Sequence, residues 1–285
     1  MIVGHIINGL VTGSTYVLIA SGLALVFGIL RIVNLAHGEI YMLGAVVSYI
    51  AAVTFGLNFW LAMLVSMIVV GIIGVLMEKV FFKKIRNAPY SSMLILSIGL
   101  AFFLQHLVQI LFGAEPRAIR TAMSTQIIRV FGTSITLQRL MIVIVGMALM
   151  VGLIFLINKT TVGKTMRATS QDRDAAMLMG ININRVYTMT FFIGSAMAAA
   201  AGSLIAPILL VFPTMGADLF IKAFTVVVLA GLGSVSGIIF AGLFIGVAES
   251  LIAVYISTAY RDTFAFLILI FMLLLKPSGL MGGKN

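Results

Sequence analysis

Long stretches without a charged residue alternate with short polar segments along the whole chain. Asp, Glu, Lys and Arg are absent from residues 1–30, 40–77, 88–114, 140–158, 186–217 and 223–248. A helix needs about 20 mainly apolar residues to cross the hydrocarbon layer of a membrane, so each run can supply one or two crossings. The pattern predicts an all-α polytopic membrane protein.

Turn-forming residues divide these runs into nine predicted spans. Residues 55–58 separate the second span from the third, and the stretch from Pro207 to Pro213 precedes the seventh. Lys222 falls inside the seventh segment, which is therefore either a crossing or a re-entrant segment buried in protein. We expect eight to nine transmembrane helices in a single domain that covers residues 1–285. The predicted spans are 6–29, 38–54, 59–79, 93–113, 139–157, 187–207, 217–234, 236–256 and 262–276.

The basic residues are divided unevenly between the two sides of this predicted domain. With nine alternating spans, 12 of the 18 Lys and Arg residues fall on the side that carries the loop at 158–186. Because cytoplasmic loops are enriched in Lys and Arg, this loop is expected in the cytoplasm. The 12 residues are Arg31, Lys79, Lys83, Lys84, Arg86, Lys159, Lys164, Arg167, Arg173, Arg185, Lys276 and Lys284.

Composition argues against several classes of function. Hydrophobic residues make up 62% of the chain and charged residues 9%, which leaves too little polar surface for a soluble globule. The net charge of +10 is spread over both sides without a basic, aromatic-rich patch, so nucleic acid binding is not expected. The chain has no cysteine and only three separated histidines, and we predict neither a metal site nor an enzyme.

A near match to a phosphate-binding loop also fails. The segment NKTTVGKT at 158–165 ends in Gly-Lys-Thr, but Asn158 stands where the first glycine of the loop is required. We therefore expect no cofactor in this chain, and ATP, if used, must be bound by partner subunits.

The loop TTVGKTMRATSQDRDAAMLMGININRV, residues 160–186, carries four basic and two acidic residues in an otherwise apolar chain. Its DAAMLMG segment predicts a short helix with small residues on one side and a final glycine, Gly180, that can end it. Such a helix can dock in a groove of a partner protein. An ordinary solvated loop between two spans is the other interpretation.

Three segments resemble the branched-chain amino acid ABC permeases, of the shorter of their two types, which are similar in fold to the ribose-type permeases. They are GILRIVNLAHGEIYMLGA (28–45), GKTMRATSQDRDAAMLMGININRV (163–186) and VVVLAGLGSVSGIIFAGLFIG (226–246), in the same order as in that family. The resemblance covers most of the chain. After Gly180 the Ile-x-Leu-Pro ending usual in ABC importers is missing.

The resemblance implies a multi-pass subunit of the bacterial inner membrane with two related, inverted halves. It would pair with a second permease subunit, two cytoplasmic ATPases and a periplasmic substrate-binding protein, and would carry branched-chain or other hydrophobic amino acids. The loop at 158–186 would be the coupling loop. Its candidate ATPase-coupling residues are Lys164, Arg167, Asp172, Arg173, Asp174, Ala175, Ala176 and Gly180.

Four polar residues are candidates for the translocation path or its gate. Asn34, His37 and Glu39 lie at a break between spans, and Glu249 interrupts an apolar segment. Charged groups inside a membrane face protein or a water-filled cavity. Each residue could line the path or satisfy neighbouring polar groups, and Glu249 together with His106 could instead serve an ion-coupled carrier or channel.

Overall fold

The computed structural model describes residues 2–130, 133–231, 233–276 and 279–280. Lys284, which entered the count of basic residues, and Leu232 in the predicted span 217–234 lie outside them. The helices are α1 (Ile2–Leu30), α2 (His37–Tyr49), η1 (Ile50–Thr54), α3 (Phe59–Met77), η2 (Glu78–Phe82), α4 (Tyr90–Phe112), α5 (Ala122–Thr125), α6 (Leu137–Lys159), α7 (Thr161–Gln171), α8 (Arg173–Leu178), α9 (Ile183–Ile205), α10 (Met215–Ala230), α11 (Val235–Tyr255), η3 (Thr258–Tyr260) and α12 (Arg261–Leu275). Strands β1 (Ile127–Val130) and β2 (Thr133–Thr136) form an antiparallel hairpin.

Seven helices in the described part of the chain are long and apolar enough to cross a membrane. They are Ile2–Leu30, Phe59–Phe82, Tyr90–Phe112, Leu137–Lys159, Ile183–Ile205, Val235–Tyr255 and Thr258–Leu275. The expected count of eight to nine is therefore not confirmed.

The difference lies in two short helices, α2 and α10, which occupy the predicted spans 38–54 and 217–234. The 16 residues of α10 rise about 24 Å, and the 13 residues of α2 rise about 20 Å before the chain passes into the π-helical turn η1. Helix α10 is shorter than the roughly 30 Å hydrocarbon layer, and α2 reaches the length of the shortest candidate span only together with the five residues of η1. An apolar run indicates that a segment is buried away from water. It does not indicate at what depth in the protein the helix begins.

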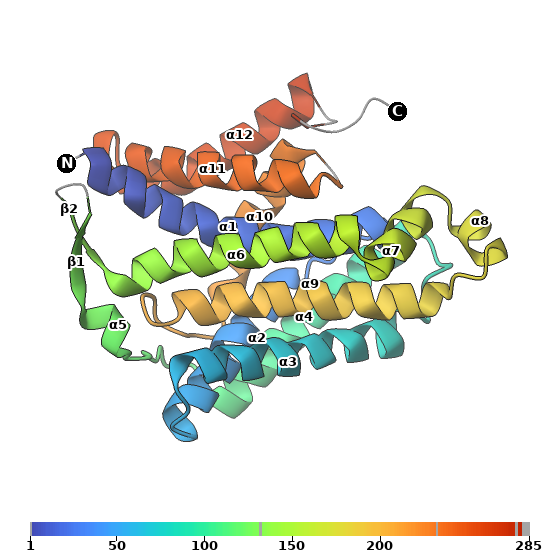
Figure 1. Cartoon of the computed structure of the whole chain (residues 1–285), viewed down its shortest axis with the longest axis horizontal. Helices are drawn as coiled ribbons and strands as arrows, with labels where there is room; N and C mark the ends of the chain where they lie inside the picture. The colour runs from blue at the N-terminus through green and yellow to red at the C-terminus, as the bar shows by residue number, and fades with distance from the viewer. Residues whose placement is uncertain (1, 131–132, 232, 277–278, 281–285) are drawn as a thin grey trace.

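Two groups of three helices have the same order of lengths. In both α1 to α3 and α9 to α11, a long helix is followed by a shorter one and then by a longer one. Helix α1 packs against α11, and α3 packs against α9, while α1 also contacts α9 and α2 contacts α10. In Figure 1, α1 runs from left to right and α9 from right to left, so these two corresponding helices are antiparallel.

Glycines allow α1 and α11 to pack with their backbones in contact. A methyl group on Gly246 would lie 2.4 Å from the backbone nitrogen of Gly13 and 2.4 Å from the carbonyl oxygen of Gly9. Small residues let membrane helices approach closely, which strengthens van der Waals contact where apolar burial supplies little driving force. These glycine pairs thus join two helices within one subunit.

The short helices α2 and α10 meet at their first turns. Gly38 and Gly216 are buried, and a methyl group on Gly38 would lie 2.3 Å from the carbonyl oxygen of Gly216. Non-helical segments, residues 31–36 and 206–214, lead into the two helices. Irregular backbone is tolerated at membrane depth where protein surrounds it.

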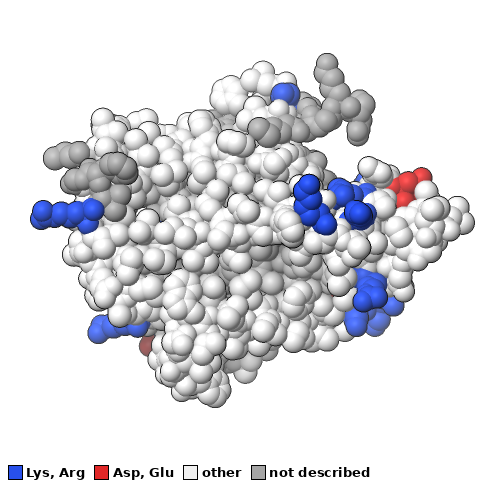
Figure 2. Space-filling view, in the orientation of Figure 1, with Lys and Arg blue, Asp and Glu red and all other residues white. Residues whose placement is uncertain are grey.

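On the face shown in Figure 2, charged side chains gather at the two ends, apart from one basic side chain at the top edge, and a broad uncharged band lies between them. The α7–α8 segment lies at one end, and the N-terminus and the β1–β2 hairpin lie at the other (Figure 1). This separation matches a belt of membrane-facing surface between two water-exposed ends.

Candidate coupling site and membrane path

Helix α8 begins with a side-chain cap. Oδ1 of Asp172 accepts hydrogen bonds from the backbone N–H groups of Asp174 and Ala175, both at 2.9 Å. An aspartate at this position satisfies backbone donors that have no partner within the helix, and its negative charge also favours the positive end of the helix dipole. Asp172 therefore fixes where this six-residue helix starts.

The same helix ends at a glycine in the left-handed region, since Gly180 has a φ of +82°. The N–H of Gly180 donates to the carbonyl of Met177 at 2.9 Å, and the N–H of Ile181 donates to the carbonyl of Ala176 at 3.0 Å. This paired closure satisfies carbonyls at the helix end, and glycine adopts it without steric strain. The expectation that Gly180 ends a short helix agrees with this geometry.

The end of α8 presents apolar side chains to solvent. Leu178 is 90% exposed and Met179 is 83% exposed, whereas Ala176 is buried against the protein. Helix α8 projects from the main body at one end of the molecule (Figure 1). Adjacent exposed apolar side chains on a projecting, capped helix are typical of a protein-binding surface.

Helix α7 attaches α8 to the membrane helix α6. The Thr160 side chain caps α7, and the Arg167 guanidinium donates a hydrogen bond to the carbonyl of Ile157 near the end of α6. Arg167 is thus an anchor for α7, whereas Lys164 on the same helix is exposed. The Gly-Lys-Thr sequence lies within this helix and does not form a phosphate-binding loop.

The structure brings the candidate coupling residues together on α7, α8 and the turns that follow each of them. Four carry exposed side chains, two are half-buried, Ala176 is buried, and Gly180 forms the exposed turn. The exposed four are Lys164, Asp172, Asp174 and Ala175, and the half-buried two are Arg167 and Arg173.

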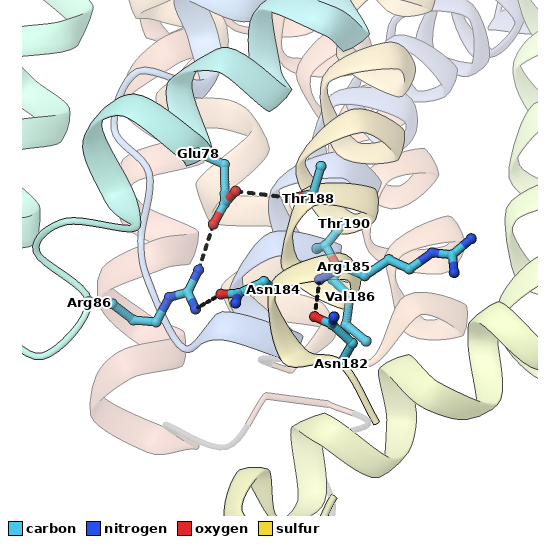
Figure 3. Close-up of polar contacts among 8 residues, drawn as sticks. All are labelled: Glu78, Arg86, Asn182, Asn184, Arg185, Val186, Thr188 and Thr190. Atoms are coloured by element: carbon cyan, nitrogen blue, oxygen red, sulfur yellow. Dashed lines mark hydrogen bonds and ion pairs between the residues drawn. The ribbon is translucent and has the colours of Figure 1, made fainter. Parts of the chain in front are cut away.

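A buried polar network lies beside this segment, at the end of α3 (Figure 3). The carboxylate of Glu78 is 1% exposed, and its Oε1 lies 2.6 Å from Nη2 of Arg86. Its Oε2 accepts a hydrogen bond from the Thr188 hydroxyl at 3.1 Å. Nη1 of Arg86 donates to Oδ1 of Asn184 at 2.9 Å, and the guanidinium lies 4.3 Å from the ring centroid of Tyr187.

This network ties the start of α9 to the end of α3. Helix α9 begins at Ile183, three residues after the glycine that ends α8, and Asn182 caps it. A displacement of α8 would therefore act on a helix end held by Glu78 and Arg86. Sequence reasoning missed this network, although Glu78 is an acidic residue at the end of a long uncharged run.

Three polar side chains at the break between α1 and α2 are buried, whereas Arg31, where the break begins, is exposed. Asn34, His37 and Glu39 are each 3% exposed or less. Oδ1 of Asn34 accepts a hydrogen bond from the backbone N–H of Ala36, so Asn34 provides a partner for a backbone group at the break between the helices. Among the described residues, Nδ2 of Asn34 and Oε2 of Glu39 have no hydrogen-bond partner.

Glu249 lies in a different cluster, between α1, α10 and α11. Its Oε2 accepts a hydrogen bond from the Tyr16 hydroxyl at 2.7 Å and lies 3.7 Å from Nζ of Lys222. The ammonium group of Lys222 also lies 5.8 Å from the ring centroid of Tyr16. His106 is on an exposed face of α4, beside Phe102. The cluster joins Lys222 and Glu249, which sequence reasoning had considered separately.

Comparison with known proteins agrees with this architecture. Residues 5–273 match the family model described as "Branched-chain amino acid transport system / permease component". The chain is 38% identical to the high-affinity branched-chain amino acid transport system permease protein LivH of Salmonella typhimurium, over 96% of this chain and 94% of the relative. It is 37% identical to LivH of Escherichia coli over the same shares, and 36% identical to BraD of Pseudomonas aeruginosa over 98% and 95%.

These matches cover nearly the whole of both chains, and the aligned region contains the capped helix α8 and the short helices α2 and α10. Together with the long apolar helices, they establish a multi-pass protein of the bacterial inner membrane. The chain belongs to the family of permease components of branched-chain amino acid transport systems.

Proposed function

We propose that this chain is a permease subunit of an ABC importer that carries branched-chain or other hydrophobic amino acids across the inner membrane. It would act as one transmembrane permease domain with its coupling loop at residues 158–186. Family membership and the names of the relatives, which are branched-chain amino acid transport permeases, support this substrate class.

The observation that carries the proposal is the projecting helix α8. It is capped by Asp172 and closed by Gly180, and it carries Leu178 and Met179 on its exposed end. A permease that is driven by ATP needs a surface on which the ATPase can act, and a self-sufficient carrier does not. Helix α8 supplies such a surface.

The partners follow from the same reasoning. Two cytoplasmic ATPases would bind ATP, this chain would hold no cofactor and catalyse no reaction, and a second permease subunit would complete the membrane path. A periplasmic binding protein would deliver the substrate. The antiparallel course of α1 and α9, with α3 packed on α9 and α1 packed on α11, supports an inverted repeat, a design that places the path between the halves near the bilayer midplane.

An ion-coupled carrier or channel is the alternative, with Glu249 and His106 as its proton-carrying groups. The structure favours it less, because Glu249 is bonded to Tyr16 and lies beside Lys222, an arrangement that stabilises the contact of three helices. His106 belongs to another part of the surface.

The proposal is tested by purifying the tagged chain from its native membrane in mild detergent and identifying the proteins that accompany it. We expect an ATPase pair and a second permease subunit, with the ATPases lost when Gly180 is replaced. A stable chain that carries no ATPase, yet transports an amino acid in proteoliposomes under an ion gradient, would establish the carrier instead.

A further inference from the structure

A cavity of about 470 Å³ lies in the half of the molecule that is opposite to α8. Its walls are the outer half of α1, the first turns of α10, the end of α11 and the segment 205–212. Arg139, at the start of α6 beside the β-hairpin, also lines the cavity and donates a hydrogen bond to Asn8. The volume is within the range of about 300–1,000 Å³ that is typical of small-molecule sites.

The cavity combines an apolar wall with charges of both signs. Ile208, Phe212 and Leu219 contribute apolar surface. Asp218 and Lys222 stand one turn apart on the same helix, α10, and both face the cavity. The ammonium of Lys222 is kept in place by Glu249 and by the Tyr16 ring.

A second, independent observation concerns Tyr41 on α2. This side chain is 0% exposed, it lines the cavity, and its hydroxyl has no hydrogen-bond partner among the described residues. A buried hydroxyl without a partner is unfavourable by about 1–3 kcal/mol, so a ligand group that bonds to it would be stabilised there.

We propose that this cavity is a substrate-binding site within a single permease subunit, and that it selects the zwitterionic form of an apolar amino acid. The inference rests on the proposed function and extends it to particular residues. The α-carboxylate would lie between the ammonium of Lys222 and the hydroxyl of Tyr41. The α-ammonium would face the carboxylate of Asp218, and the aliphatic side chain would pack against Ile208, Phe212 and Leu219.

This arrangement predicts a selectivity that apolar packing alone would not give. Leucine has both charges, leucinamide lacks the carboxylate, and 4-methyl-2-oxopentanoate lacks the ammonium. A site with one group for each charge loses one of its polar contacts when either charge is absent, and without the carboxylate the buried hydroxyl of Tyr41 stays unpaired, which discriminates against the analogue. Packing against the aliphatic side chain would be the same for all three compounds.

The natural chain has no cysteine, which makes single-cysteine labelling direct. Leu219→Cys and Ile208→Cys place a thiol in the cavity, and Ile127→Cys, on the exposed hairpin, is the control. The complete transporter, with its partner subunits, would be treated with a membrane-impermeant methanethiosulfonate, and labelling would be followed on this chain. Free leucine, leucinamide and the oxo acid would be tested as protectants.

We expect leucine to slow labelling in the cavity at both positions, the other two compounds to leave it unchanged, and the control to be unaffected by all three. Asp218→Asn, which keeps the side-chain size, should raise the leucine concentration for half-protection about tenfold or more. Labelling that leucine does not slow at either cavity position, or equal protection by all three compounds, would overturn the inference.

ATP-driven uptake from the loaded binding protein, measured on the same wild-type preparation, separates the two levels of the proposal. Uptake of a branched-chain amino acid, together with no protection by leucine, would refute the binding site in the cavity and leave the proposed transport function unaffected. Absence of uptake of any amino acid would refute both the binding site and the proposed transport function.

Discussion

Replacing Gly180 by alanine should weaken binding of the ATPase without affecting the membrane domain. The φ of Gly180 is +82°, and an added methyl group would meet no atom within 4 Å, so the change acts through backbone strain alone. For a residue other than glycine this region is unfavourable by about 1–2 kcal/mol. If docking requires the closed end of α8, the dissociation constant should rise roughly 5- to 30-fold.

The assay is a titration of the purified permease complex with the ATPase subunits. A thermal unfolding curve of the permease should not shift, because Ala176 is the buried residue of α8 and little else of this helix belongs to the core. Asp172→Ala removes the cap at the other end of the helix and should weaken binding independently, by about 0.5–2 kcal/mol.

Gly56→Ala is a matched control. Gly56 has a φ of +65° and equally open surroundings, but it lies in the turn before α3, at the opposite end of that helix from Glu78. Its replacement imposes the same kind of strain away from α8. Equal dissociation constants for the Gly180 and Gly56 variants would refute the reasoning.

Three further variants test other parts of the structure. Arg86→Met leaves the Glu78 carboxylate buried without its ion pair and should lower stability by about 3–5 kcal/mol, and the double variant with Glu78→Gln should recover part of the loss in thermal unfolding. Glu249→Gln should retain ATP-driven uptake, because protons do not drive it and the amide oxygen can still accept the hydrogen bond from Tyr16; loss of uptake in a correctly assembled complex would contradict this. Gly246→Val should prevent correct folding because its side chain would overlap the backbone of α1, whereas Gly99→Val, which meets no atom within 4 Å, should not, as membrane-fraction yield and detergent gel filtration would show.

The sequence predicted the long helices well because each of them corresponds to an apolar run along the chain. It could not predict the depth at which α2 and α10 begin, because that depth depends on the contact between Gly38 and Gly216. These residues are 178 positions apart, and the contact depends on the packing of the two halves. The sequence shows small residues in both segments, but it does not show that the two segments are in contact.

Local features of the coupling loop were more accessible to sequence reasoning than contacts across helices. The short helix and its final glycine follow from a few adjacent residues, and the structure contains both. The bonds of Glu78 to Arg86 and Thr188 connect segments that are far apart in the sequence in the case of Thr188, so no local pattern predicts them. An acidic residue directly after an uncharged membrane run was the signal that could have suggested a buried partner.

The central claim, that an ATPase docks on α8, is tested most directly by crosslinking in the native membrane. Leu178→Cys places the single thiol of this chain on the exposed end of α8, and Ile127→Cys places it at the opposite end of the molecule. With a short thiol-to-amine crosslinker, the account predicts an adduct with the ATPase subunit from position 178 and none from position 127. No ATPase adduct from position 178 in an assembled, active transporter would contradict it.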